Sequence, residues 1–193
     1  EFDITDLLHD GENVVAVACY EYSSASWLED QAFWRLHGLF RSVDLTAQPH
    51  VHVENMQLEA DWDAESGTAS LDAALSVRNA SDAATISATL KDSEGNVIWE
   101  TSTNADANTT IASGSLQGLE PWSAENPSLY ELEVNIIDQA GNIVETAVQK
   151  VGFRRFRIEN GIMTLNGKRI VFKGADRHEF DAKRGRSITE QDM

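Results

Sequence analysis

The sequence predicts a mostly β protein, and three observations favour this fold class. Apolar runs of about five to nine residues alternate with clusters of Gly, Asn, Asp and Ser, as short strands alternate with turns. β-Branched residues are dense in these runs, and such side chains favour extended backbone. The chain of 193 residues contains only 3 prolines. We therefore expect strands throughout and little helix before residue 187.

The first segment carries two predicted strands, at residues 13–20 and 39–46. Cys19 lies in the apolar run VVAVACY, so we expect a small buried hydrophobic side chain there. One cysteine cannot form an internal disulfide, and this fits a reducing, cytoplasmic location. Pro49 marks the first expected boundary. Because Glu1 falls within a strand pattern and Met193 follows a charged turn, we expect the chain to be an internal piece of a longer protein.

Seven strand-like runs follow Pro49, and seven short strands in roughly 100 residues suit an immunoglobulin-like sandwich. They are residues 51–61, 68–78, 84–91, 96–103, 109–116, 128–138 and 142–151. The turns at 94–96 and 140–142 both contain Gly followed by Asn, residues that tolerate the positive φ of hairpin turns.

The pattern changes after residue 150. Asn166 and Gly167 separate two apolar runs and predict a type I′ hairpin, and a strand at 169–173 ends on Gly174. Ser187 and Glu190 have the spacing of a capping box, so we expect a helix to begin there. A strand, a loop and a helix start form half of a βα unit.

Charge also divides the chain near residue 150. Residues 1–150 carry 5 basic and 26 acidic side chains, a net charge of −21, whereas residues 151–193 carry 10 basic and 6 acidic ones, a net charge of +4. The total of −17 repels phosphate backbones and anionic membrane surfaces, so we expect no nucleic-acid or membrane partner. No apolar run approaches the roughly 18 residues of a membrane helix.

The segment from Trp27 to Arg35 is the first candidate site. It places Glu29, Asp30 and Gln31 between Trp27 and Trp34. Aromatic faces stack on sugar rings, while carboxylates and amides accept hydrogen bonds from hydroxyls, so the segment suits a sugar pocket. The structural alternative is that the two tryptophans lie in a core and that Asp30 caps a turn or pairs with Arg35.

The run Asp176, Arg177, His178 and Glu179 is the second candidate site. A histidine flanked by carboxylates can contact sugar hydroxyls or ligate a metal. The alternative is a cluster of surface ion pairs. Zinc-hydrolase, phosphate-loop and serine-hydrolase motifs are absent from the sequence. We expect Trp62, Trp99 and Trp122 to lie in or beside sandwich strands, as core residues rather than as a ligand platform.

Three motifs in order carry a resemblance to a known family. They are LEDQAFWRLHGLFRSVDLTAQP, then PWSAENPSLYELEV, then VGFRRFRIENGIMTLNGKRIVFKGADRHEF. In this order they resemble the β-galactosidases of glycoside hydrolase family 2. The resemblance implies the end of a jelly-roll sugar-binding domain at residues 1–48, an immunoglobulin-like sandwich at 49–152 and the start of a (β/α)8 barrel at 153–193.

The resemblance also implies site residues. Asp30 matches the family aspartate that contacts the galactose and a sodium ion, and His178 matches the histidine that contacts the galactosyl group. Sodium and magnesium, and a homo-oligomer, are expected for the longer protein. The chain departs from the family at Asp176, where many relatives have asparagine, so hydrogen bonding around His178 could differ.

The resemblance assigns no catalytic residue to this chain. A retaining glycosidase needs two carboxyl groups about 5–5.5 Å apart. The family's two glutamates lie on later barrel strands, and neither Glu179 nor Glu190 matches them. We therefore expect part of an enzyme that cleaves terminal β-D-galactosides such as lactose, inactive alone. The alternatives are a carbohydrate-binding β-sandwich module, a β-glucuronidase or β-mannosidase of the same family, and a purely structural linker.

Overall fold

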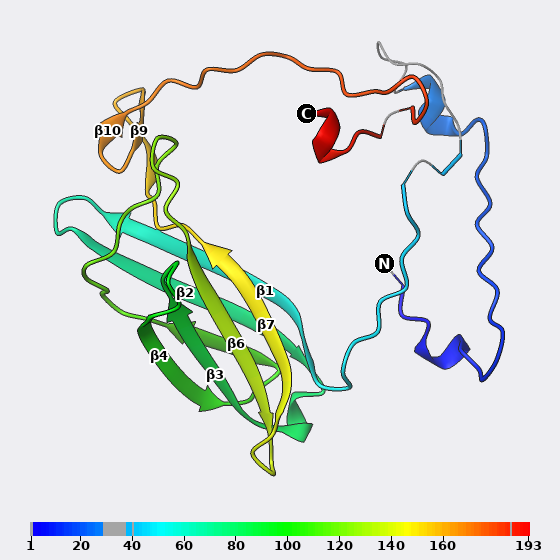
Figure 1. Ribbon diagram of the computed structural model, residues 1–193, viewed down its shortest axis with the longest axis horizontal. Coiled ribbons are helices and arrows are strands. Elements are labelled where there is room, and N and C mark those ends of the chain that lie inside the picture. Colours follow the sequence, from blue (N-terminus) through cyan, green and yellow to red (C-terminus); the bar gives the residue numbers. More distant parts are fainter. Residues whose placement is uncertain (1, 29–37, 40, 186) are drawn as a thin grey trace. The chain divides into compact units, whose positions relative to one another are not determined.

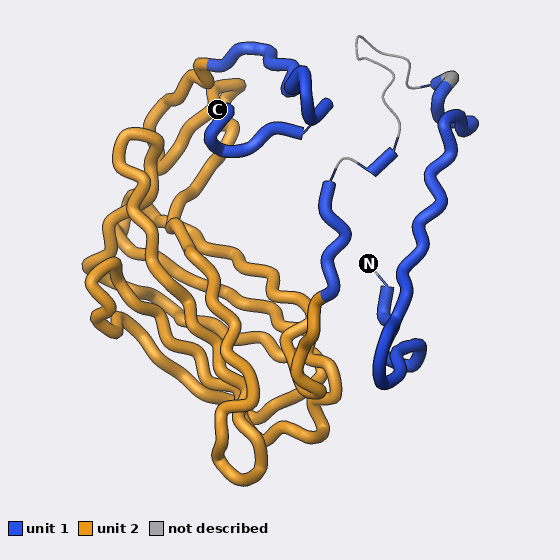
Figure 2. The backbone as a smooth tube through the Cα atoms, turned by 45° about the vertical axis from the view of Figure 1, so that its right-hand side comes forward, with its two compact units in different colours: residues 1–45, 174–193 blue, residues 46–173 orange. Residues whose placement is uncertain are grey.

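The computed structural model describes residues 2–28, 38–39, 41–185 and 187–193. The chain forms two compact units, one of residues 1–45 with 174–193 and one of residues 46–173 (Figure 2). The second unit, which is described throughout, contains the sheets. The fold class is confirmed as mostly β with a central sandwich.

The unit 46–173 is a two-layer antiparallel sandwich (Figure 1). One sheet has the order β1-β2-β5 and the other the order β4-β3-β6-β7. The strands are β1 (His52–Asp63), β2 (Thr68–Arg78), β3 (Ala83–Lys91), β4 (Val97–Asn104), β5 (Asn108–Ala112), β6 (Tyr130–Asp138) and β7 (Ile143–Val151), with a 3-10 turn η3 (Ala80–Asp82) before β3. All seven predicted sandwich strands are therefore confirmed, with bounds shifted by a few residues.

Alternation of the side chains explains the core. In β2, Leu71 and Leu75 are buried while Asp72 between them is exposed. In β6, Leu132 and Val134 are fully buried, and Glu133 between them is half-buried. Since successive side chains of a strand point to opposite faces, each sheet turns one apolar face to the other sheet.

The two long hairpins of the second sheet use the same turn. Asp92 and Asp138 each accept two backbone N–H bonds through Oδ1 and a side-chain N–H from the Asn four residues on. The glycine before that Asn has φ of 86° in one turn and 87° in the other. The aspartate side chains thus satisfy turn amides that the ladders leave free.

A third, small sheet follows the sandwich in the order β10-β9-β8. Its strands are β8 (Phe156–Glu159), β9 (Ile162–Leu165) and β10 (Lys168–Arg169). Asn166 and Gly167 have φ of 51° and 76°, which agrees with the predicted type I′ turn. The strand after the turn is shorter than predicted, since residues 170–173 form no ladder.

The unit of residues 1–45 and 174–193 contains the 3-10 turns η1 (Thr5–Leu7), η2 (Ser24–Trp27) and η4 (Glu190–Asp192). The strand prediction for 13–20 is wrong, because these residues form no ladder, and the described residues of 39–46 form none either. Cys19 is exposed, so its predicted burial is also wrong. A strand needs a neighbour to satisfy its N–H and C=O groups, and these segments pair with none in the described part of the chain.

The predicted helix from Ser187 is wrong as well. The capping box lies two residues later, where the Thr189 side chain and the Asp192 carboxylate cap one turn of 3-10 helix. A single turn offers few hydrogen bonds to offset the free-energy cost of helix nucleation. Among the described residues no helix has the length and apolarity to cross a membrane.

Candidate functional site

His178, the predicted sugar contact, is exposed on an extended segment. Beside it, the Arg177 Nε atom lies 3.5 Å from the Glu179 Oε1 atom, which is the ion pair expected from the structural alternative. Residues 174–180 form no strand, so the strand end predicted to present His178 is not formed here. The described geometry of this segment therefore shows the surface ion pair, and the sugar contact of His178 stays a prediction.

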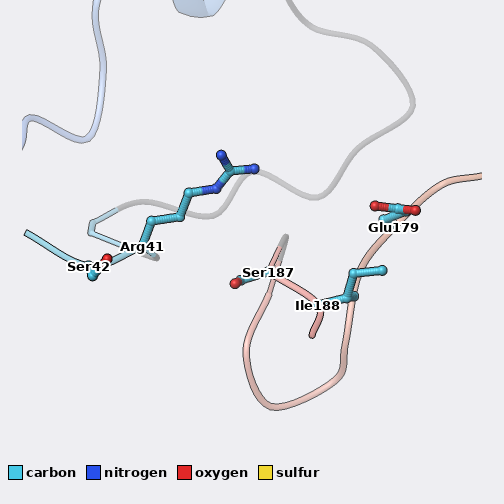
Figure 3. A pocket seen from close by; sticks show the side chains of 5 residues that line it. All are labelled: Arg41, Ser42, Glu179, Ser187 and Ile188. Atoms are coloured by element: carbon cyan, nitrogen blue, oxygen red, sulfur yellow. The ribbon is translucent and has the colours of Figure 1, made fainter. Parts of the chain in front are cut away.

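A shallow cavity of about 320 Å³ lies next to this cluster (Figure 3). Its lining comes from two separate segments of the same unit and consists of Arg41, Ser42, Glu179, Ser187 and Ile188. A guanidinium, a carboxylate and two hydroxyls offer both donors and acceptors, which is what a sugar's hydroxyl groups require. The cavity is thus chemically compatible with a polar ligand.

The other predicted site residues lie outside the described residues. Asp30, assigned to sugar and sodium, and Trp34 both fall in residues 29–37, and the Trp27 side chain is not described. The described residues contain no group of three or more His, Cys, Asp or Glu side chains that could hold a metal ion. The assignments of Asp30 and His178 stay predictions.

The prediction that the remaining tryptophans belong to the core is confirmed in part. Trp62 and Trp99 are partly buried and pack against the core. Trp122 is half-buried, and the Arg154 guanidinium lies 4.7 Å from its ring centroid, a cation–π geometry.

An ion-pair cluster that sequence reasoning missed lies at the end of β1. Arg155 donates from Nε to both carboxylate oxygens of Asp61, at 2.8 and 3.0 Å, and from Nη2 to Oδ2. Its Nη1 atom lies 3.7 Å from the Asp63 Oδ2 atom. The Arg155 hydrogen bond holds the pKa of Asp61 below its usual value, and Asp61 raises the pKa of Arg155. The partners are 94 residues apart, so no local motif identifies them.

Comparison with protein families accounts for nearly the whole sequence. Residues 51–154 match glycosyl hydrolases family 2, residues 1–49 match the sugar binding domain of that family, and residues 156–193 match its TIM barrel domain. The boundaries predicted after residues 48 and 152 stay predictions.

Similar proteins carry consistent names. The chain is 58% identical to the β-galactosidase BgaC of Bifidobacterium adolescentis and 47% identical to a β-galactosidase of Streptococcus thermophilus, in both cases over 100% of the chain. It spans only 20% and 19% of the lengths of these relatives.

Solved structures resemble the fold. An apo structure of β-glucuronidase 3 from Bacteroides uniformis matches with a TM-score of 0.70 and 30% identity, over 82% of this chain and 20% of that one. A β-glucuronidase of Parabacteroides merdae matches with a TM-score of 0.65 and 23% identity, over 74% of this chain and 18% of that one. The second likeness shows the fold alone. From the family match across the sandwich, together with the matches on both sides of it, the chain belongs to glycosyl hydrolases family 2.

Proposed function

We propose that the chain is part of a β-galactosidase that cleaves terminal β-D-galactosides, such as lactose, with retention of configuration. The observation that carries the proposal is the 58% and 47% identity, over the entire chain, to proteins named β-galactosidase. The ordered motifs around Asp30, Trp122 and His178 support the same activity.

The proposed chemistry needs groups beyond those of this chain. Retention requires a nucleophilic carboxylate and an acid/base carboxyl group about 5–5.5 Å apart. The family resemblance assigns neither role to Glu179 or Glu190. The longer protein therefore supplies the reacting carboxylates, and the 193-residue chain alone is inactive.

Within that protein, this chain supplies sugar contacts. The Asp30 carboxylate accepts hydrogen bonds from sugar hydroxyls and offers an oxygen ligand of the kind that sodium binds. The His178 imidazole can donate or accept a hydrogen bond, depending on its tautomer. Both contacts hold the galactosyl ring while the bond to the aglycone is cleaved.

A β-glucuronidase is the second candidate, because the solved β-glucuronidase 3 of Bacteroides uniformis shares the fold at 30% identity. The 58% identity to a β-galactosidase favours the first candidate. The two activities also differ in charge, since a glucuronide carries a carboxylate that a galactoside lacks. That carboxylate needs a cationic partner in the pocket.

Aryl β-galactoside and aryl β-glucuronide hydrolysis by the longer protein distinguishes the two candidates. We expect the galactoside to be cleaved with a kcat/KM at least about a hundredfold higher, since a pocket shaped for neutral hydroxyls leaves the glucuronide carboxylate unpaired. The chain of 193 residues, assayed in parallel, should show no turnover above a blank without protein. Faster cleavage of the glucuronide would contradict the proposal.

A further inference from the structure

The sequence contains two Asn-Gly pairs, Asn160 with Gly161 and Asn166 with Gly167, and each forms the two-residue turn of a hairpin. The first pair joins β8 to β9, and the second joins β9 to β10 (Figure 1). The φ angles of Asn and Gly are 52° and 76° in the first turn and 51° and 76° in the second. The small sheet thus holds the same dipeptide twice with nearly the same φ angles, so a difference between the two pairs must come from their surroundings.

An Asn-Gly pair is chemically labile because the glycine nitrogen can attack the asparagine side chain. Glycine has no Cβ atom, so its backbone nitrogen is little hindered. The nitrogen forms a bond to the side-chain Cγ atom and gives its proton to water, while the side-chain NH2 group takes up a proton and leaves as ammonia. Water then opens the resulting succinimide ring at either carbonyl, which leaves an aspartate or an isoaspartate. The reaction needs only the dipeptide and water.

The first pair is exposed and unrestrained. Both Asn160 and Gly161 are exposed, and a Cβ atom on Gly161 would meet nothing within 4 Å. The Asn160 side chain forms no hydrogen bond with any residue that the structure describes. Ring closure requires the side chain and the backbone of the turn to rotate, and here only the exposed tip of a hairpin has to open.

Three hydrogen bonds hold Asn166 of the second pair. Its Nδ2 atom donates to the Trp122 carbonyl at 3.1 Å, and its Oδ1 atom accepts from the Arg155 N–H at 2.9 Å. The Asn166 N–H donates to the Arg155 carbonyl at 2.8 Å. The Trp122 backbone is itself fixed, since its N–H donates to the carbonyl of Phe153, which is fully buried. Ring closure at Asn166 therefore requires these hydrogen bonds to break first.

We propose that Asn160 is a site of spontaneous deamidation and that the contacts of Asn166 protect the second pair from the same reaction. The products would also differ in their cost. A carboxylate at position 166 would place an oxygen against the Trp122 carbonyl, which now accepts the amide N–H of Asn166, and two acceptors would face each other. At position 160 the new carboxylate would face water. The fold thus directs the reaction to the turn where the charge is solvated.

Mass spectrometry of the aged 193-residue chain tests the proposal, because one tryptic peptide, residues 158–168, contains both pairs. The folded chain is incubated at mildly alkaline pH and digested, and fragment ions assign the amide-to-carboxylate mass change to Asn160 or Asn166. Asn160 should react at least about tenfold faster than Asn166, since the hydrogen bonds of Asn166 raise the barrier to ring closure.

Two references separate the effect of the fold from that of the sequence. In a synthetic peptide of residues 158–168, and in the 193-residue chain unfolded in urea, both pairs should react at similar rates, because each asparagine precedes a glycine. The variant Asn160→Gln is the matched control in the folded chain. It should lose the fast reaction, because a glutamine side chain must close a larger ring, and Asn166 should stay as slow as before.

Three results would overturn the proposal. Equal rates at Asn160 and Asn166 in the folded chain would show that the contacts of Asn166 give no protection. An Asn160 that stays intact in the folded chain while the synthetic peptide converts would remove the site itself. A difference between the pairs that persists in urea would assign the selectivity to the sequence instead of the fold. None of these results depends on glycoside hydrolysis, so they test the inference separately from the proposed function.

Discussion

Phe153 joins the end of β7 to the core, and replacing it with alanine is the most informative test of the sandwich. The side chain is 0% exposed. Its ring lies 5.5 Å from the Tyr130 ring in an edge-to-face arrangement. The Tyr130 hydroxyl in turn accepts the Glu120 N–H at 2.7 Å, so the ring that Phe153 contacts is itself held in place.

The magnitude follows from the burial. Phe→Ala in a packed core removes the transfer free energy of the ring and leaves a cavity, which together cost about 3–5 kcal/mol. The aromatic pair contributes about 0.5–1.5 kcal/mol of its own, so we expect the upper part of that range. Since the free energy of unfolding of a single domain is only about 5–15 kcal/mol, the variant should keep only a small part of it.

Urea unfolding of the 193-residue chain, followed by tryptophan fluorescence, measures the effect. With a urea slope of about 2 kcal/mol per molar, the midpoint should fall by about 2–2.5 M. Phe2→Ala is the matched control, because Phe2 is 91% exposed and should change stability by less than about 0.5 kcal/mol. A Phe153→Ala midpoint within about 0.3 M of the control would refute the assignment of Phe153 to the core.

Two further predictions concern packing and charge in the same unit. Gly152→Ala should destabilise the sandwich by about 1–3 kcal/mol, since its new Cβ would meet Trp122 at 3.0 Å; Gly174→Ala, where nothing lies within 4 Å, should be nearly neutral in the same urea titration. The hydrogen bond from Lys91 lowers the pKa of Glu133 from its usual 4.5, so the folded state favours the ionised form. The stabilisation by ionised Glu133 is therefore present above about pH 4.5, and it is lost as the pH falls through the lowered pKa of Glu133 in the folded state. Urea midpoints at pH 7, 5 and 3 should decline only at the lowest pH, and Glu133→Gln should reduce that decline; an equal decline in the variant would exclude Glu133 as a cause.

The sandwich could be predicted from the sequence because its strands carry a local pattern of alternating apolar and polar residues. Residues 68–78 and 128–138 alternate in hydrophobicity, and the turn after each hairpin's first strand contains a glycine with positive φ. Local pattern and tertiary burial agree best in β2, where buried and more exposed side chains alternate along the strand. The Asn166–Gly167 turn was predictable for the same reason.

The flanking segments were predicted less well because their structure depends on distant partners. Residues 13–20 have a strand pattern, yet a strand forms only when another strand accepts its hydrogen bonds. The predictions of a buried Cys19 and of a helix from Ser187 are wrong for a related reason, because Cys19 is exposed and the turn η4 buries no residue, so packing stabilises neither. The ion pair of Asp61 and Arg155 has no local sequence signal, because the fold brings together two residues that are 94 positions apart in the sequence.

The account's central claim is that this chain supplies sugar contacts to a β-galactosidase, and kcat/KM of the longer protein on an aryl β-galactoside tests it most directly. A hydrogen bond from a charged acceptor is worth about 1.5–3 kcal/mol, so Asp30→Ala should lower kcat/KM about tenfold or more. His178→Ala should lower kcat more than it raises KM, provided that its contact strengthens toward the transition state. Asp10→Ala, which removes an exposed carboxylate from the same unit, should leave kcat/KM within about twofold, and all three variants should keep the melting temperature of the unchanged protein. Unchanged kcat/KM in both Asp30→Ala and His178→Ala, or a loss of stability with unchanged turnover per folded molecule, would contradict the claim.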